Sequence, residues 1–266
     1  MIGTYVSAAL ICAASLLVGR ALLLLAGRDS WSWLEPAVGF GAVLSVTGVL
    51  ARAPGHGTSA TLGLTLLLIA AAAVVLMAPA RADGPESGRI GRFEAHRRRE
   101  VLRRGLPVAL AVALVLSIPF AINARWGLLG VGFNNDLGLH LAWAEWLRSG
   151  AGPVPETGYP LGPHGLAVAT AAIPGIGLGQ AFVGEIFAIG ILTGLTALAA
   201  LPGFGPGRRV LAATLVAISY LGASYFAQGA FKELAEALFV LAVAVGLRKI
   251  DLRRRGDVPS LGGPYG

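Results

Sequence analysis

The sequence has little charge and almost no cysteine. Only 13% of its 266 residues are charged, whereas 55% are hydrophobic and the mean hydropathy is +0.72. A soluble domain of this length cannot bury so much apolar surface, but a chain in a lipid bilayer need not bury it. The single cysteine, Cys12, excludes a disulfide within the chain and a metal site built on several thiolates.

Long apolar stretches dominate what is present. Several reach the roughly 20 residues that a helix needs to cross about 30 Å of hydrocarbon. Helices are expected because backbone polar groups must be satisfied internally in lipid, and the sequence lacks the alternating pattern of a membrane barrel. We therefore predict an all-α integral membrane protein with about seven transmembrane helices and an outer loop that contains surface-lying helices. The expected spans are 4–27, 36–51, 58–80, 105–124, 181–202, 210–227 and 230–247.

A basic loop at 81–104 divides the chain. The predicted organisation is an N-terminal three-span segment (1–80), this loop, a core (105–250) with an outer loop (125–180), and a disordered tail (251–266). The net charge is +7, and the basic residues cluster beside apolar runs. That placement is typical of residues that set membrane topology, rather than of nucleic-acid binding.

The 21 basic residues distinguish two topologies. If 165–178 lies on the outer surface and 181–202 crosses, 17 basic residues face the cytoplasm and 4 face outward. If 165–178 also crosses, the division becomes 11 to 10. The positive-inside rule favours the first arrangement. We therefore expect a multi-pass protein of the cell membrane, with loop 81–104 and the C-terminus cytoplasmic and loop 125–180 on the outer face.

Chemically active side chains gather after the fourth apolar run. Asn134-Asn135-Asp136 begins a predicted helix, and either asparagine is suited to its N-cap. Successive helical residues turn by about 100°, so Asp136 and His140 share a face that Glu145 opposes. An acid and an imidazole one turn apart can exchange a proton or bind a divalent ion. The alternative is an interfacial helix whose Asp136 favours the positive end of the helix dipole.

Two later stretches on the same predicted side add polar groups. Tyr159 and His164 belong to a Gly/Pro-rich turn that enters an apolar helix, where the dipole favours a neutral His164 imidazole. Lys232 and Glu233 begin the last apolar run, and charges at the edge of lipid are costly unless satisfied. Lys232 could neutralise a phosphate while the Glu233 carboxylate holds the lysine in place. The alternative is a snorkelling lysine with a local ion pair. Glu185 could be a further partner.

The order of these features resembles the GT-C-fold membrane glycosyltransferases, which take a sugar from a polyprenyl-phosphate donor. The resemblance covers roughly residues 106–247: a span, an outer loop with an acid near its start, a Tyr-Pro-x-Gly-x-His turn at 159–164, and further spans. The 228–233 stretch, Gln-Gly-Ala-Phe-Lys-Glu, is similar to a motif of bacterial members. The chain departs from the family in having amides where a paired acid would stand, in three preceding spans, and in stopping after seven spans. Under this resemblance the chain would be a fragment, a truncated product or a minimal member.

The resemblance implies sugar transfer outside the cytoplasm. Asp136 would be the catalytic base, and Lys232 would stabilise the departing lipid phosphate. The remaining donor-phosphate or substrate contacts would be Glu233, His140, His164, Asn135 and Tyr159. The cofactor stays open, with a divalent cation (Mg²⁺ or Mn²⁺) on Asp136 as one option. The implied partners are the polyprenyl-phosphate sugar and the bilayer, with an unidentified acceptor and no nucleic acid.

Two other functions stay open. A transporter or flippase-like module would place charges midway along spans and break helices in both halves. A non-catalytic scaffold or assembly subunit would tolerate alanine at Asp136, His140 and Lys232.

Overall fold

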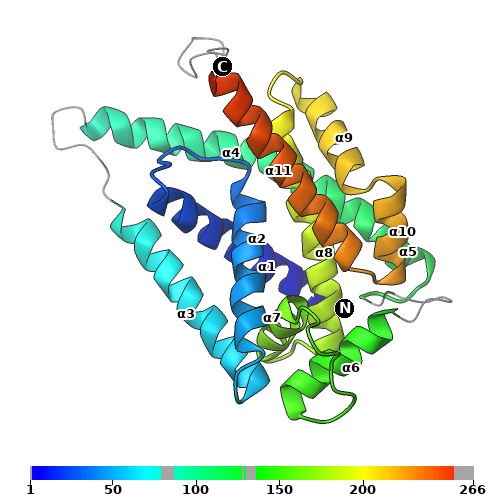
Figure 1. Cartoon of the computed structure of the whole chain (residues 1–266). Coiled ribbons are helices and arrows are strands. Elements are labelled where there is room, and N and C mark those ends of the chain that lie inside the picture. Colours follow the sequence, from blue (N-terminus) through cyan, green and yellow to red (C-terminus); the bar gives the residue numbers. More distant parts are fainter. Residues whose placement is uncertain (1, 79–86, 128, 130–135, 255–266) are drawn as a thin grey trace.

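The computed structural model describes residues 2–78, 87–127, 129 and 136–254, and of residues 87–98, 136 and 249–254 it describes the backbone alone. Within these residues every regular element is a helix (Figure 1). The helices are α1 (Ile2–Leu25), α2 (Glu35–Leu50), α3 (His56–Met77), α4 (Ser87–Leu116), α5 (Ile118–Ile122), α6 (Asp136–Ser149), α7 (Gly162–Ala171), α8 (Leu178–Ala197), η1 (Leu198–Ala200), α9 (Pro206–Ala217), α10 (Tyr220–Gln228) and α11 (Lys232–Arg254). The predicted all-α class is confirmed.

Four segments of the described chain are long and apolar enough to cross a membrane. They are Ile2–Leu25, His56–Met77, Arg99–Ile122 and Leu178–Ala200. The pair α9 and α10 adds a fifth if it is counted as one broken span, because its two helices meet at 52°. These segments agree with an integral membrane protein.

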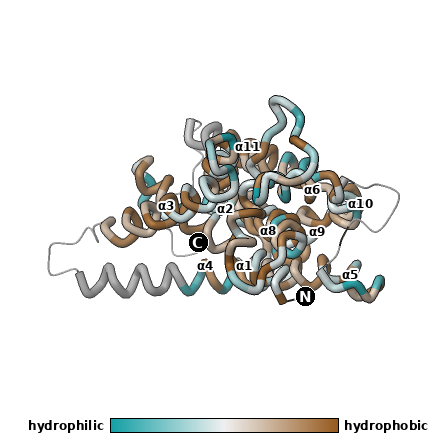
Figure 2. Tube along the Cα trace, turned by 90° about the horizontal axis from the view of Figure 1, so that it is seen from below, coloured by the Kyte–Doolittle hydropathy of each residue, from teal (hydrophilic) through white to brown (hydrophobic). Residues whose placement is uncertain are grey.

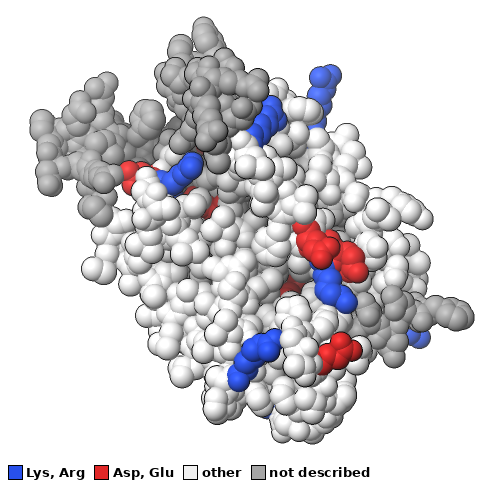
Figure 3. All heavy atoms as spheres, in the orientation of Figure 1, with Lys and Arg blue, Asp and Glu red and all other residues white. Residues whose placement is uncertain are grey.

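The outer surface of the helices is apolar, as a lipid-facing surface would be. Large hydrophobic side chains are exposed on one side of α3, α4, α9 and α11, for example Ile69 (60%), Leu114 (72%), Leu211 (61%) and Val240 (68%). Brown, hydrophobic residues follow most of the helices in Figure 2. On the face seen in Figure 3, charged side chains form only a few separate groups on an otherwise uncharged surface. Exposed apolar area on this scale marks a surface that meets something other than water.

Helix α8 lies at the centre of the bundle (Figure 1). Of an apolar 18-residue stretch of the segment Leu178–Ala200, 94% is buried inside the protein. Helix α1 runs parallel to it, since Ser7 Oγ donates to the carbonyl oxygen of Ala181 (3.1 Å) and Cys12 approaches that of Ala188. Helix α4 runs antiparallel to it, with Gly105 near Leu195 and Gly190 near Leu116. Helix α1, from the predicted N-terminal segment, therefore packs against α8 at the centre of the predicted core.

The bundle has two distinct ends. At what we call the arginine end, Arg20, Glu35, Gly105 and Leu195 lie near one another across α1, α2, α4 and α8. At the opposite end, called the histidine end, Gly3 meets α8, and Gly48 and Gly57 meet α7. Helix α2 connects the two ends although it has only 16 residues.

Helices α1 and α2 approach closely through glycine. A Cβ on Gly39 would overlap the carbonyl oxygen of Ser15, and one on Gly19 would overlap that of Glu35. Small residues let membrane helices bring their backbones together, which strengthens van der Waals packing where lipid supplies no hydrophobic drive.

Four boundaries differ from the sequence expectation. The run 210–227 is two helices, because Ser219 caps α10 by accepting a hydrogen bond from the Gly222 amide (3.3 Å). Helix α4 continues from the basic segment into the apolar run without a break, through Pro107. Helix α11 extends to Arg254, four residues into the predicted tail, and 255–266 lie outside the described residues. The helix expected at 165–178 is α7, which ends at Ala171.

Candidate functional site

Helix α6 buries His140 on the face opposite Glu145, as helical periodicity predicts. His140, Trp143 and Leu147 are buried, whereas Glu145 lies on the outer side and pairs with Arg148 (2.7 Å). The stripe of buried residues at spacings of three and four is the helical repeat expected for one face.

Helix α7 is buried within the protein because two of its glycines sit against α2. A Cβ on Gly162 would come within 2.6 Å of the Leu44 carbonyl oxygen, and one on Gly165 within 2.7 Å of that of Thr47. The Thr47 hydroxyl also donates to the Gly162 carbonyl oxygen (2.9 Å). This contact fixes the first turn of α7 and points its third residue, His164, into the protein, where it is fully buried.

The two histidines meet. His140 Nδ1 lies 3.1 Å from His164 Nε2, a hydrogen bond in which one imidazole donates and the other accepts. Aromatic rings from two helices and two connecting segments enclose the pair. The rings of Trp143, Tyr159, Phe182 and Phe231 all lie within 6.3 Å of the His140 ring centre. Both histidines are at most 1% exposed.

The environment keeps His164 neutral. Its burial lowers its pKa from 6.5 to about 3, with smaller contributions from the nearby His140 and Lys232 charges. The direction matches the sequence prediction, but the cause is burial rather than the helix dipole. A neutral His164 can accept or donate in the bond to His140, whereas a protonated one would face Lys232 in a poorly solvated position.

Lys232 and Tyr159 extend the group toward the surface. Lys232 Nζ lies 5.8 Å from the centre of the Tyr159 ring, within the range of a cation–π contact. The preceding residue, Phe231, packs edge-on against His140 at 4.8 Å. Glu233 follows, and its buried Oε2 has no hydrogen-bond partner among the described residues. Four predicted site residues therefore lie together, although they come from three separate stretches of the chain: His140, Tyr159, His164 and Lys232.

The start of α6 belongs to the same region. Gly229 ends α10 with a φ of 75°, and a Cβ there would lie 2.9 Å from Leu137 Cβ. Asp136 is the first residue of α6 and precedes Leu137 in the chain. Leu137 thus brings the start of α6 close to Gly229, which lies at the junction of α10 and α11, three residues before Lys232. The side chain of Asp136 and the whole of Asn135 lie outside the described residues.

Glu185 sits deeper. It is fully buried within α8, and neither carboxylate oxygen has a hydrogen-bond partner in the described part of the chain. It lies one turn along α8 from Phe182, which contacts both histidines. The described side chains contain no group of three or more His, Cys, Asp or Glu able to hold a metal ion.

Sequence reasoning did not predict Phe182 and Phe231 as part of this site. A phenylalanine in an apolar run gives no signal of its own, since its neighbours in space come from other helices. Comparison of the chain with profiles of protein families, with curated proteins and with solved structures finds no match.

Proposed function

We propose that the chain is a membrane glycosyltransferase that moves a sugar from a polyprenyl-phosphate donor to an acceptor, with its site at the histidine end. The observation that supports this best is the convergence of Lys232, Tyr159 and the two histidines beside the start of α6. A transferase of this kind needs a cation for the lipid phosphate and a base for the acceptor within one site.

We further propose seven spans, counting α2, α9 with α10, and α11, with the arginine end in the cytoplasm. Alternating crossings make α1 and α8 parallel and α4 antiparallel to both, which is the relation found between them. The arrangement places Arg20, Arg28 and Arg104 with the cytoplasmic loop and Lys232 on the outer side, as the positive-inside rule favours.

In the proposed reaction the acceptor hydroxyl attacks the anomeric carbon of the donor. Its proton passes to the Asp136 carboxylate, and the bond between the anomeric carbon and the phosphate oxygen breaks with both electrons leaving on the phosphate. Lys232 stabilises the negative charge that develops there, because a fixed cation in a poorly solvated site acts strongly on a leaving group. The buried histidine pair positions α6 against α7 rather than contacting the sugar. The described side chains include no group of three or more metal-ligating residues, and the Asp136 side chain lies outside them.

The test compares two variants of α6. Asp136→Asn removes the proposed base, whereas Glu145→Gln changes an acid on the opposite, outer face of the same helix. Protein in proteoliposomes receives radiolabelled polyprenyl-phosphate sugars together with a membrane extract as the source of acceptor. We expect Asp136→Asn to lose at least about 100-fold in turnover, the typical contribution of a general base, while donor binding and Glu145→Gln turnover persist. Turnover by Asp136→Asn at the Glu145→Gln level would remove Asp136 from the mechanism.

A second candidate, a transporter or flippase-like module, is favoured by two observations. The pair α9–α10 is broken by 52°, and the buried Glu185 lies inside a candidate span. Broken helices and intramembrane acids are typical of transport sites. Transport of a fluorescent lipid across liposomes that depends on Glu185, without sugar transfer, would favour this function over the first.

A further inference from the structure

Arginine side chains gather at the arginine end, where α9 begins beside α4. The two helices flank one face of α8, since a Cβ on Gly194 would lie within 3.5 Å of side chains from both. Arg209 of α9 is close enough to α4 for the charges of Arg104 and Glu100 to act on it. Together with the adjacent arginine on each helix, Arg104 and Arg209 form what we call the α4–α9 arginine group: Arg103, Arg104, Arg208 and Arg209.

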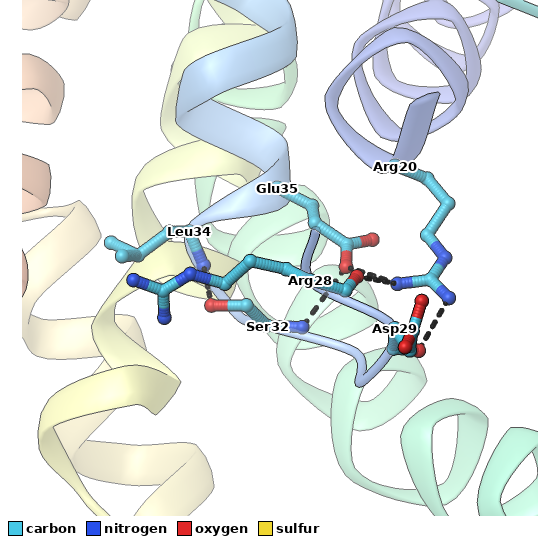
Figure 4. A network of polar contacts seen from close by, with 6 residues as sticks. All are labelled: Arg20, Arg28, Asp29, Ser32, Leu34 and Glu35. Atoms are coloured by element: carbon cyan, nitrogen blue, oxygen red, sulfur yellow. Dashed lines mark hydrogen bonds and ion pairs between the residues drawn. The ribbon is translucent and has the colours of Figure 1, made fainter. Parts of the chain in front are cut away.

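Arg20 lies at the same end but is already occupied within the protein. Its guanidinium donates to the carbonyl oxygens of Arg28 and Asp29 (3.3 and 2.7 Å) and pairs with the buried Glu35 at 3.4 Å (Figure 4). These contacts tie the α1–α2 loop to both helices. The charge of Arg20 therefore has a structural partner, and Arg20 is not part of the site proposed below.

Glu100 is the described acid beside the α4–α9 arginine group, and it does not neutralise the group. Its carboxylate pairs with Arg104 at 2.5 Å and with Arg103 at 3.8 Å. Among the ion pairs of the described residues, none involves Arg208 or Arg209. One carboxylate thus stands against four guanidinium groups, so the described side chains of this group keep a net positive charge.

Guanidinium nitrogens of this group remain open to a ligand. Arg209 uses Nη2 to bond the carbonyl oxygens of Pro202 and Phe204 (3.3 and 2.6 Å), which holds the loop before α9. Its Nη1 has no acceptor in the described part of the chain and is not buried. Arg104 bonds Glu100 through Nε alone, so both of its Nη atoms are also open. The planar fork of a guanidinium matches the oxygen atoms of a phosphate.

The first turn of α9 favours a negative charge at the same place. Gly205 precedes the helix without a side-chain cap, Pro206 occupies its first position, and the turn contains no acid. The amide N–H groups at the start of a helix have no intrahelical acceptor, and the helix dipole is positive there. Arg208 lies in this turn, where the dipole disfavours a cation. An anion beside Arg208 therefore offsets a repulsion within the described part of the protein.

Exposed leucines continue from the arginine group along both helices. On α9, Leu211 and Leu215 follow Arg208 by three and seven residues and are 61% and 57% exposed. On α4, Leu106 and Leu110 take the same places relative to the first arginine of the group and are 55% and 61% exposed. These intervals place the leucines on the helix faces that carry the arginines, one and two turns further along. A ligand with a phosphate at the arginines and hydrocarbon along the leucines matches both features.

We propose that the α4–α9 arginine group binds one anionic phospholipid from the leaflet at the arginine end. The phosphate accepts hydrogen bonds from Arg104 and Arg209, and the acyl chains lie along the exposed leucines of both helices. Basic groups between membrane helices on the cytoplasmic side are typical of such sites. The net positive charge favours a headgroup whose only charge is the phosphate over one that also carries an amine. The site is independent of the proposed transferase function.

The test is native mass spectrometry of the full-length protein in mild detergent, supplied with phosphatidylglycerol or phosphatidylethanolamine of the same acyl chains. Arg208→Gln removes one charge from the group, and the exposed Arg208 side chain makes no hydrogen bond or ion pair with the described residues. Arg125→Gln removes the same charge from an exposed position beyond α5, at the other end of α4, as a matched control. Arg103→Gln is combined with Arg208→Gln to extend the series.

We expect one bound phosphatidylglycerol in the wild type and in Arg125→Gln. The affinity should fall about fivefold in Arg208→Gln and about 25-fold when Arg103→Gln is added, since one arginine near a membrane surface contributes about a factor of five. Phosphatidylethanolamine should bind more weakly than phosphatidylglycerol, and excess inorganic phosphate should not displace the lipid.

Equal affinity of Arg208→Gln and Arg125→Gln for phosphatidylglycerol would overturn the arginine group as the site. Binding of phosphatidylethanolamine as tight as that of phosphatidylglycerol would overturn the recognition of net charge. Displacement by inorganic phosphate would identify free phosphate, rather than a lipid, as the ligand.

Discussion

The buried histidine pair makes the protein sensitive to acid. Burial lowers the pKa of His164 to about 3, below its value of about 6.5 in an unfolded chain. Between these values the unfolded state binds more protons, so the His164 contribution is complete above about pH 6.5 and declines as the pH falls. From pH 7.5 to pH 5 the expected loss is about 2 kcal/mol, since each pKa unit corresponds to about 1.4 kcal/mol.

Equilibrium unfolding in detergent, followed by tryptophan fluorescence, measures this loss. Trp143 is a suitable reporter because its ring centre lies 5.8 Å from that of His164. In His164→Gln the decline between pH 7.5 and pH 5 should shrink by about 2 kcal/mol. His56→Gln removes an imidazole outside the pair and should retain the wild-type decline, because His164 is still present. Equal slopes in the wild type and His164→Gln would refute the assignment of acid sensitivity to this buried imidazole.

Two further predictions concern packing and topology. Gly39→Ala should destabilise the protein by about 1–3 kcal/mol, the usual cost of overpacking, because the new methyl group would overlap α1. Gly246→Ala, where a Cβ meets nothing within 4 Å, should be neutral or slightly stabilising in thermal unfolding, and similar losses in both would contradict the close-packing argument. For topology, Cys12→Ser provides a background without cysteine. A membrane-impermeant maleimide should then label Glu156→Cys in intact cells, and Arg208→Cys only after permeabilisation; labelling of both from one side would exclude the seven-span arrangement.

Hydropathy predicted the long helices well and the short ones poorly. The run expected at 58–80 is α3, because a continuous apolar stretch of this length has few alternatives to a helix. Hydropathy did not predict the division of the run 210–227 into two helices. Apolar residues lie on both sides of Ser219, and the hydrogen bond by which Ser219 caps α10 has no hydropathy signal. The burial of α7 could not be predicted from the sequence either, because it depends on the contact of Gly162 and Gly165 with the backbone of α2.

The same distinction applies to the site. The position of His140 on the α6 face opposite Glu145 followed from helical periodicity alone. The bond between His140 and His164 did not, because His164 reaches it only through the tertiary contact between α7 and α2.

The enclosure of α8 also has a consequence for biosynthesis. Its neighbours α9, α10 and α11 follow it in the chain, so they are absent when α8 first enters the membrane. At that moment Glu185 can be shielded only by helices already made, and an ionisable residue inside an inserting helix is costly unless it is shielded. Helix α1, which already lies parallel to α8 in the finished bundle, is available as an early partner. We therefore expect weakened α1–α8 contacts to lower the yield of newly inserted chains more than the lifetime of folded ones, a difference that pulse-labelling can measure.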